Sequence, residues 1–178
     1  MAKKASQRKS TGTLMRKALR YLRKNDGRKV KRAKDPNRMS PEALRHTMEG
    51  NRTKTDDYKK RTGGHYRPGG KDFPGRRTDP PTKTHPSGAY EARTEFLVHD
   101  PGPPPTDTWK VKAGNGGKST FFPDDWTPGK IDNAISDAFK NGTKNADGSW
   151  SGTGPDGLPI VGFWDTASGA IKHGYPSI

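Results

Sequence analysis

Positive charge is concentrated in the first 80 residues, and this limits which part of the chain can form a compact core. Residues 1–80 carry 25 Lys and Arg against 8 Asp and Glu, whereas residues 81–178 carry 9 against 11. Apolar residues make up only 26% of the chain, against roughly 45–50% in average globular proteins. We therefore expect much of the basic half to lack a core of its own. Its charge favours a polyanionic partner, nucleic acid or an anionic membrane.

The chain lacks the sequence features of a membrane-spanning or signal-bearing protein. No apolar run approaches the roughly 20 residues of a transmembrane helix. The basic N-terminus is not followed by the apolar segment of a signal peptide, so we expect export to use another route, for example as part of a larger polypeptide. There is no cysteine, which excludes disulfides and thiolate metal sites.

Residues 1–39 are predicted to be a basic leader in front of a domain that covers residues 40–178. Residues 1–11 are polar and basic, and we expect them to be disordered. A helix is predicted from Thr13, with apolar residues along one side and Gly27 beyond its end. The leader is either a solvated linker or an arm that contacts RNA, and the sequence leaves both open.

Two helices of the domain are predicted from the same start signal. Ser40-Pro41 and Thr127-Pro128 each combine an N-cap residue with proline at the first helical position. The first helix should run through Glu49 and stop at Gly50. The second is the clearest in the chain, because Gly142 ends it and its apolar residues recur at helical spacing. These residues are Ile131, Ala134, Ile135, Ala138 and Phe139.

Several segments have the pattern of β-strands. Residues 89–98 alternate, so that every second side chain shares one face, and residues 109–113 are predicted as a partner strand. Further short strands are expected near residue 150, at 160–164 and at 170–175. This order of elements predicts an α+β domain in which helices pack on antiparallel sheets. The aromatic residues predicted to lie in the sheet core are Trp150, Phe163 and Trp164.

His46 and His65 lie 19 positions apart in the basic half, each beside glycines. Two imidazoles amid positive charge are what RNA cleavage without metal needs: one takes a proton from a 2′-hydroxyl and the other gives one to the leaving oxygen. Histidine suits both roles because its ordinary pKa, about 6.5, populates both protonation states near neutrality. Lys118, at the end of a Gly-rich loop, can stabilise the charge that develops on phosphorus. Alone, each of these residues is more typical of an exposed turn or helix end.

An ordered series of segments in the domain resembles the bacterial branch of the EndoU ribonucleases. These ribonucleases are found as C-terminal toxin domains in bacterial competition systems. The resemblance covers roughly residues 40–178 and is carried by the order of the segments more than by any one of them. The segments are His46-Thr47-Met48-Glu49-Gly50, Gly63-Gly64-His65-Tyr66, His85-Pro86-Ser87-Gly88-Ala89-Tyr90-Glu91-Ala92, Gly116-Gly117-Lys118-Ser119-Thr120-Phe121-Phe122-Pro123-Asp124-Asp125-Trp126 and Gly174-Tyr175-Pro176.

The resemblance implies a role for each matched residue. His65 would be the general base, His46 the general acid, and Lys118 the cation that stabilises the transition state. Tyr175 matches a tyrosine that orients the substrate, whereas His173 stands where the family has a threonine or serine whose hydroxyl helps select uridine. This replacement weakens the expectation of a strict uridine preference. The residues expected to bind substrate are His173, Gly117 and Arg67.

The implied reaction is attack of the 2′-hydroxyl on phosphorus, which leaves a 2′,3′-cyclic phosphate and a 5′-hydroxyl, so DNA is excluded as a substrate. Single-stranded RNA, with uridines and tRNA as candidate targets, is the expected partner. No cofactor, small molecule or membrane partner is expected, and we predict no metal site, although some members of the family are stimulated by manganese. An acidic immunity protein is expected to cover the basic cleft. The chain would act in the cytoplasm of a target cell, as a secreted or delivered effector.

Two functions of other classes remain compatible with the composition. A non-catalytic RNA-binding or ribosome-binding protein would also use a basic, disordered first segment. A protein that compacts DNA would bind duplexes tightly in a salt-sensitive manner and would yield no product.

Overall fold

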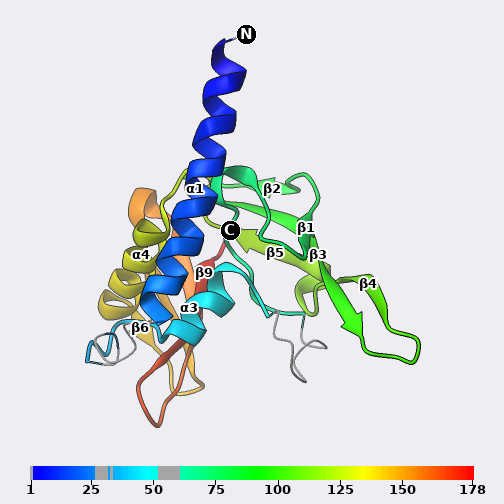
Figure 1. The fold of residues 1–178 in the computed structure, drawn as a ribbon. Coiled ribbons are helices and arrows are strands. Elements are labelled where there is room, and N and C mark those ends of the chain that lie inside the picture. The colour runs from blue at the N-terminus through cyan, green and yellow to red at the C-terminus, as the bar shows by residue number, and fades with distance from the viewer. Residues whose placement is uncertain (1, 27–31, 33, 52–60) are drawn as a thin grey trace.

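The chain folds into the expected α+β architecture, with helices packed on antiparallel sheets (Figure 1). The computed structural model describes residues 2–26, 32, 34–51 and 61–178. The α-helices in these residues are α1 (Ala2–Asp26), α3 (Pro41–Met48) and α4 (Pro128–Asn141). None of the described helices is long and apolar enough to cross a membrane.

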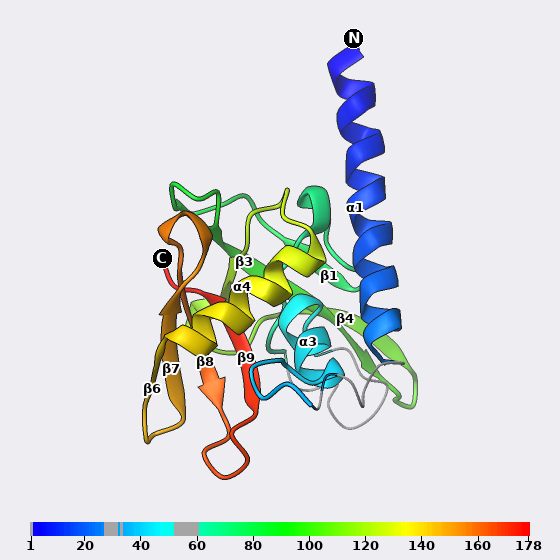
Figure 2. The ribbon, with the colours of Figure 1, turned by 90° about the vertical axis from the view of Figure 1, so that its left-hand side faces the viewer.

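The first sheet is built around one long strand, β3 (Tyr90–Asp100), whose neighbours are all antiparallel to it. Its burial alternates as predicted, because every second side chain from Tyr90 to Val98 is buried. Beyond the sheet, β3 and β4 project as a hairpin in both views (Figures 1 and 2). The neighbours of β3 are β1 (Arg76–Thr78), β2 (Lys83–Thr84), β4 (Thr106–Val111) and β5 (Lys118–Phe121).

The second sheet is a four-stranded antiparallel meander near the C-terminus. It pairs Phe163 with His173 and Val161 with Tyr175, and α4 covers one of its faces. Phe139 of α4 meets Trp150 edge to face, with ring centroids 5.3 Å apart. The strands of this sheet are β6 (Thr143–Lys144), β7 (Ser149–Thr153), β8 (Pro159–Trp164) and β9 (Ile171–Pro176), and 3-10 turns occur at η2 (Pro68–Gly70), η3 (Asn115–Gly117) and η4 (Pro155–Gly157).

The predicted starts of α3 and α4 are confirmed by their capping hydrogen bonds. The Ser40 hydroxyl accepts a hydrogen bond from the backbone N–H of Ala43, and the Thr127 hydroxyl accepts one from Lys130. In each case proline occupies the first turn, where its missing N–H costs no helical hydrogen bond. The two signals therefore fix where α3 and α4 begin.

The N-terminal segment departs from the prediction. Helix α1 begins at Ala2, so residues 2–11 are helical where disorder was expected. Its first residues are mostly Ala, Lys, Arg and Gln, which favour helix. Ala18 and Leu22 lie in the main core, and Met39 joins them. The packing thus draws core residues from both sides of the predicted boundary between residues 39 and 40.

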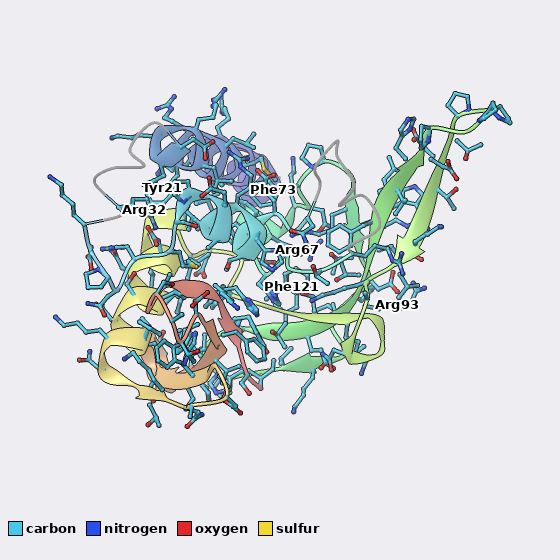
Figure 3. The ribbon with its side chains drawn as sticks, turned by 90° about the horizontal axis from the view of Figure 1, so that it is seen from below. Tyr21, Arg32, Arg67, Phe73, Arg93 and Phe121 are labelled. Atoms are coloured by element: carbon cyan, nitrogen blue, oxygen red, sulfur yellow. The ribbon has the colours of Figure 1, made fainter. Side chains whose placement is uncertain are left out.

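A buried ion pair holds this segment onto α4. Asp132 of α4 accepts two hydrogen bonds from the Arg32 guanidinium, each of 2.9 Å, and one of 2.7 Å from the Tyr21 hydroxyl. Tyr21, a residue of α1, and Arg32 lie next to each other (Figure 3). The Asp132 side chain is fully buried, so these bonds replace the water that the carboxylate loses.

The core prediction fails at Phe163, whose ring is 44% exposed. In β8 the buried residues are Ile160 and Gly162, whereas the side chains of Val161 and Phe163 point to the opposite face. That face is turned away from α4. Trp150 is buried in the core as predicted, and Trp164 packs partly against it.

Candidate active site

The two histidines are brought together by a junction between the end of α3 and residues 63–65. The last carbonyls of a helix have no partner within the helix and need donors from elsewhere. Here the carbonyl of His46 accepts hydrogen bonds from the N–H groups of Gly50 and Gly64, and that of Thr47 accepts one of 2.7 Å from His65. The end of α3 is thereby satisfied by the segment that carries the second histidine.

Glycine is required at two positions of this junction. Gly63 and Gly64 have φ of +74° and +77°, in the left-handed region that side chains rarely adopt. A Cβ at Gly63 would lie 2.3 Å from the carbonyl oxygen of His46, and one at Gly64 would lie 2.8 Å from the Arg76 guanidinium. The Gly-Gly pair therefore allows the two histidine segments to approach each other closely.

Both imidazoles line one cavity of about 700 Å³ between the two sheets and α3. Tyr175 and His173 of β9, Lys118 of β5 and Phe163 of β8 line it as well. The further residues that line the cavity are Thr62, Gly63, Glu91, Lys112, Ala113, Gly114, Asn115, Thr120, Val161, Pro176, Ser177 and Ile178.

His65 is held in one tautomer by its surroundings. Its Nδ1 lies 2.7 Å from the carbonyl oxygen of Thr120, which can only accept a hydrogen bond. Nδ1 therefore carries the proton, and Nε2 is left with the lone pair. Burial, followed by the charge of Lys112, lowers the pKa of His65 well below its ordinary 6.5. His65 is thus a neutral base at physiological pH.

His46 has a similar arrangement on α3. Its Nδ1 lies 2.7 Å from the side-chain oxygen of Asn51, and the Asn51 amide nitrogen donates to the Thr62 hydroxyl. The Asn51 oxygen accepts the Nδ1 proton, so Nε2 is the nitrogen that can exchange a proton with a substrate. Burial lowers the pKa of His46 below 6.5, and the charge of Lys112 lowers it further.

The rings of His173 and Tyr175 connect those of His46 and His65 in a continuous series of contacts. His46 meets His173 edge to face at 5.5 Å, and His173 stacks with Tyr175 at 5.3 Å. Tyr175 in turn stacks with His65 at 4.9 Å. Burial and the neighbouring charges of His46 and Lys112 lower the pKa of His173 to about 4, so this third imidazole is neutral at physiological pH.

Two imidazoles and a lysine line one cavity, where they could exchange protons with a ligand or contact an anion. The family model described as bacterial EndoU nuclease matches residues 40–178. The chain belongs to the bacterial EndoU nuclease family. A Bacillus cereus protein named Toxin is 38% identical over 90 residues, which cover 51% of this chain and 14% of that protein. The chain therefore matches only a small part of this relative. No solved structure matches the chain.

Lys118 lies in the cavity of this EndoU domain but is not free. Its Nζ donates a 3.1 Å hydrogen bond to the Glu91 carboxylate on the neighbouring strand. The Lys118 side chain is 42% exposed, and exposed ion pairs contribute at most about 1 kcal/mol. A phosphate group can therefore displace Glu91 from Lys118 at small cost.

Two residues expected to bind substrate do not line the cavity. The Arg67 guanidinium pairs with Asp72 and donates to the Tyr90 hydroxyl, in a part-buried cluster. The Gly117 N–H donates to the carbonyl of Gly114 within the turn, so it is already used. Gly117 has a structural role, because a Cβ there would lie 2.3 Å from the Val111 side chain.

Two residues of the EndoU cavity were missed by sequence reasoning. Lys112 follows β4, and Phe163 was predicted to be core. The alternation of β8 was a signal that Phe163 and Val161 share a face, but it did not indicate which face α4 covers.

The donor set of the EndoU cavity does not resemble a metal site. Within the described residues, no three His, Asp or Glu side chains are grouped so that they could hold a metal ion.

Proposed function

We propose that this chain is a metal-independent RNA endonuclease toxin. The observation that carries the proposal is that His46 and His65 line one cavity, each with Nδ1 on an oxygen acceptor and Nε2 left for the substrate. Two imidazoles held this way supply an acid and a base without a cofactor.

The mechanism follows from the protonation states. Nε2 of neutral His65 removes the proton from a 2′-hydroxyl, whose oxygen attacks the adjacent phosphorus. Protonated His46 gives its Nε2 proton to the 5′-oxygen as the P–O bond breaks. The products are a 2′,3′-cyclic phosphate and a 5′-hydroxyl. The phosphate of bound RNA favours the charged form of His46 and offsets the effect of burial.

Positive charge in the cavity stabilises the phosphorane-like transition state. Lys118 leaves Glu91 to contact a non-bridging oxygen, as its exposed position allows. The Tyr175 hydroxyl stays protonated because burial raises its pKa, so it donates a hydrogen bond to the substrate.

Base selection involves His173 and Phe163. His173 is neutral, so it presents one donor and one acceptor to a base edge where a hydroxyl would present a rotatable group. Tyr175 already stacks with two imidazoles, whereas the Phe163 ring is exposed beside them and available for stacking on a base. The enzyme therefore cleaves single-stranded RNA, including exposed loops of tRNA, with a relaxed preference for uridine.

The biological role is that of a delivered effector. It is supported by the family and by the similarity to the Bacillus cereus protein named Toxin. A net charge of +15 favours RNA as the target and an acidic immunity protein as the inhibitor in the producing cell. The toxin acts in the cytoplasm of the target cell, where RNA is accessible.

The test is incubation of the protein with total RNA in the presence of EDTA, followed by analysis of the product ends. We expect cyclic phosphate and 5′-hydroxyl ends with wild type and a loss of at least about 100-fold with His46→Ala and with His65→Ala. His85→Ala is the matched control, because His85 lies outside the cavity. Full cleavage by either site variant would refute the acid–base pair. Binding without cleavage by wild type would favour a non-catalytic RNA-binding protein.

A further inference from the structure

Lys112 lines the cavity and also makes a defined hydrogen bond within the protein. It follows β4 and is half-buried, and its Nζ donates a 3.0 Å hydrogen bond to the hydroxyl oxygen of Ser119. Ser119 lies on β5 with only 1% of its surface exposed. A lysine ammonium donates only, so this contact uses one lone pair of the serine oxygen.

The hydroxyl proton of Ser119 is committed elsewhere. Ser119 donates it to the carbonyl of Gly64 at 2.9 Å, next to the catalytic histidine. The Ser119 oxygen also lies 3.3 Å from Nδ1 of His65. Since its proton points to Gly64 and one lone pair is used by Lys112, Ser119 can only accept from His65. The contact with Ser119 therefore requires a proton on Nδ1 of His65, as does the hydrogen bond that the Thr120 carbonyl accepts from the same nitrogen.

Lys112 also acts on His65 through its charge. It is the largest charged influence on the pKa of His65, and it lowers that pKa together with burial. Burial and the charge of Arg76 in turn lower the pKa of Lys112 to about 8, so the ammonium form dominates at neutral pH. The other titratable groups that face His65 or line its cavity are His46 on α3, His173 and Tyr175 on β9, Lys118 on β5 and Glu91 on β3.

We propose that Lys112 is a positioning residue for His65: through Ser119 it keeps the ring proton on Nδ1, and through its charge it keeps the ring neutral, so that Nε2 is ready to accept the substrate proton. The proposal rests on His65 being the general base of the proposed function. Lys118 and Lys112 then have different roles, because Lys118 meets the phosphate and Lys112 prepares the base.

The deciding experiment is an NMR titration of the histidine side chains in the RNA-free protein, with the His65 signal assigned by its absence from His65→Gln. In wild type we expect the Nδ1–H tautomer and a neutral ring down to well below pH 6.5. Lys112→Met keeps a long, unbranched side chain but removes the charge, so the midpoint for His65 should rise. Lys112→Arg keeps the charge and should retain the low midpoint. Lys110→Met is the matched control, because Lys110 is an exposed lysine of β4 only two positions before Lys112.

Kinetics give a second readout. The rise of kcat/KM with pH follows deprotonation of the base, so Lys112→Met should move this limb to higher pH and lose more activity at pH 5 than at pH 8. Ser119→Ala removes the contact but keeps the charge, so it should lower kcat without moving the limb.

The outcomes separate this proposal from failure of the proposed function. An unchanged His65 titration in Lys112→Met would overturn the proposal, as would an equal shift in Lys112→Arg. A rise in KM at every pH with normal His65 titration would make Lys112 a phosphate contact instead, and would also overturn it. If the wild type cleaved no RNA, the proposed function would fail, while the NMR titration would still decide the state of His65.

Discussion

Gly63 is the residue on which the geometry of the two imidazoles depends most directly. Gly63→Ala places a Cβ against the His46 carbonyl and the His46 ring, in a conformation that already costs about 1–2 kcal/mol for alanine. We expect loss of RNA cleavage and a drop in the free energy of unfolding of about 2 kcal/mol or more, measured by urea denaturation. Gly169→Ala is the matched control, because Gly169 has φ of +78° and open space around it. If both variants lost the same activity and the same free energy of unfolding, the effect would come from the backbone conformation alone and not from the contact with His46.

Substitutions of Phe163 test whether its exposed ring stacks on a base of the RNA. Stacking of one base on an aromatic side chain contributes about 1–3 kcal/mol, so Phe163→Ala should raise KM by about 5- to 150-fold. Phe163→Trp should keep or lower KM, since indole offers a larger face. The fold should tolerate both changes because the ring is exposed. A KM that is indifferent to Phe163→Ala would place the base elsewhere in the cavity.

The residues that sequence reasoning could find are those marked by local chemistry. His46, His65, Lys118, His173 and Tyr175 were expected together, through their segments and the family resemblance, and they line one cavity. Lys112 could not be found, because its direction depends on how β4 pairs with β3 and how the chain turns into β5. The roles of Arg67 and Gly117 likewise depend on partners that only the folded chain brings near, namely Asp72, Tyr90 and Gly114.

At the scale of elements, the caps predicted α3 and α4 well, because an N-cap side chain and proline act within one turn. The short strands β1, β2 and β6 could not be predicted, since two or three residues carry no usable alternation. The packing of α1 was also missed. The apolar side of this helix was predicted, but the helix was assigned to a leader outside the domain, whereas its Ala18 and Leu22 lie in the main core.

The attachment of α1 and residue 32 to α4 gives a stability prediction. Asp132→Asn leaves the buried Arg32 guanidinium without its counter-charge, which typically costs about 3–5 kcal/mol. Asp26→Asn is the control, because it removes a half-exposed pair with Arg45 and should cost at most about 1 kcal/mol. Urea denaturation of both variants measures the difference. If Asp132→Asn unfolded like the control, the N-terminal segment would be dispensable for the domain.

At the scale of the whole molecule, burial and positive charge lower the pKa of both histidines, and this gives a prediction for the pH dependence of the proposed reaction. If His65 is the base, it must be neutral, so kcat/KM should rise with pH through a pKa well below 6.5. If His46 is the acid, it must be protonated, so kcat/KM should fall with pH through a pKa that is also below 6.5 in the free protein. We therefore expect a maximum of kcat/KM on the acidic side of pH 6.5, measured with a short RNA at constant ionic strength. A maximum near pH 8 would contradict these protonation states.

The junction between α3 and residues 63–65 has a consequence for how the protein loses activity. Both imidazoles depend on the same few backbone hydrogen bonds, donated by Gly64 and His65 to the end of the helix. If these bonds open, both proton-transfer groups leave their places in the same event, without the rest of the molecule unfolding. The protection of these two amides against hydrogen exchange should therefore measure the fraction of molecules in which both imidazoles are in place.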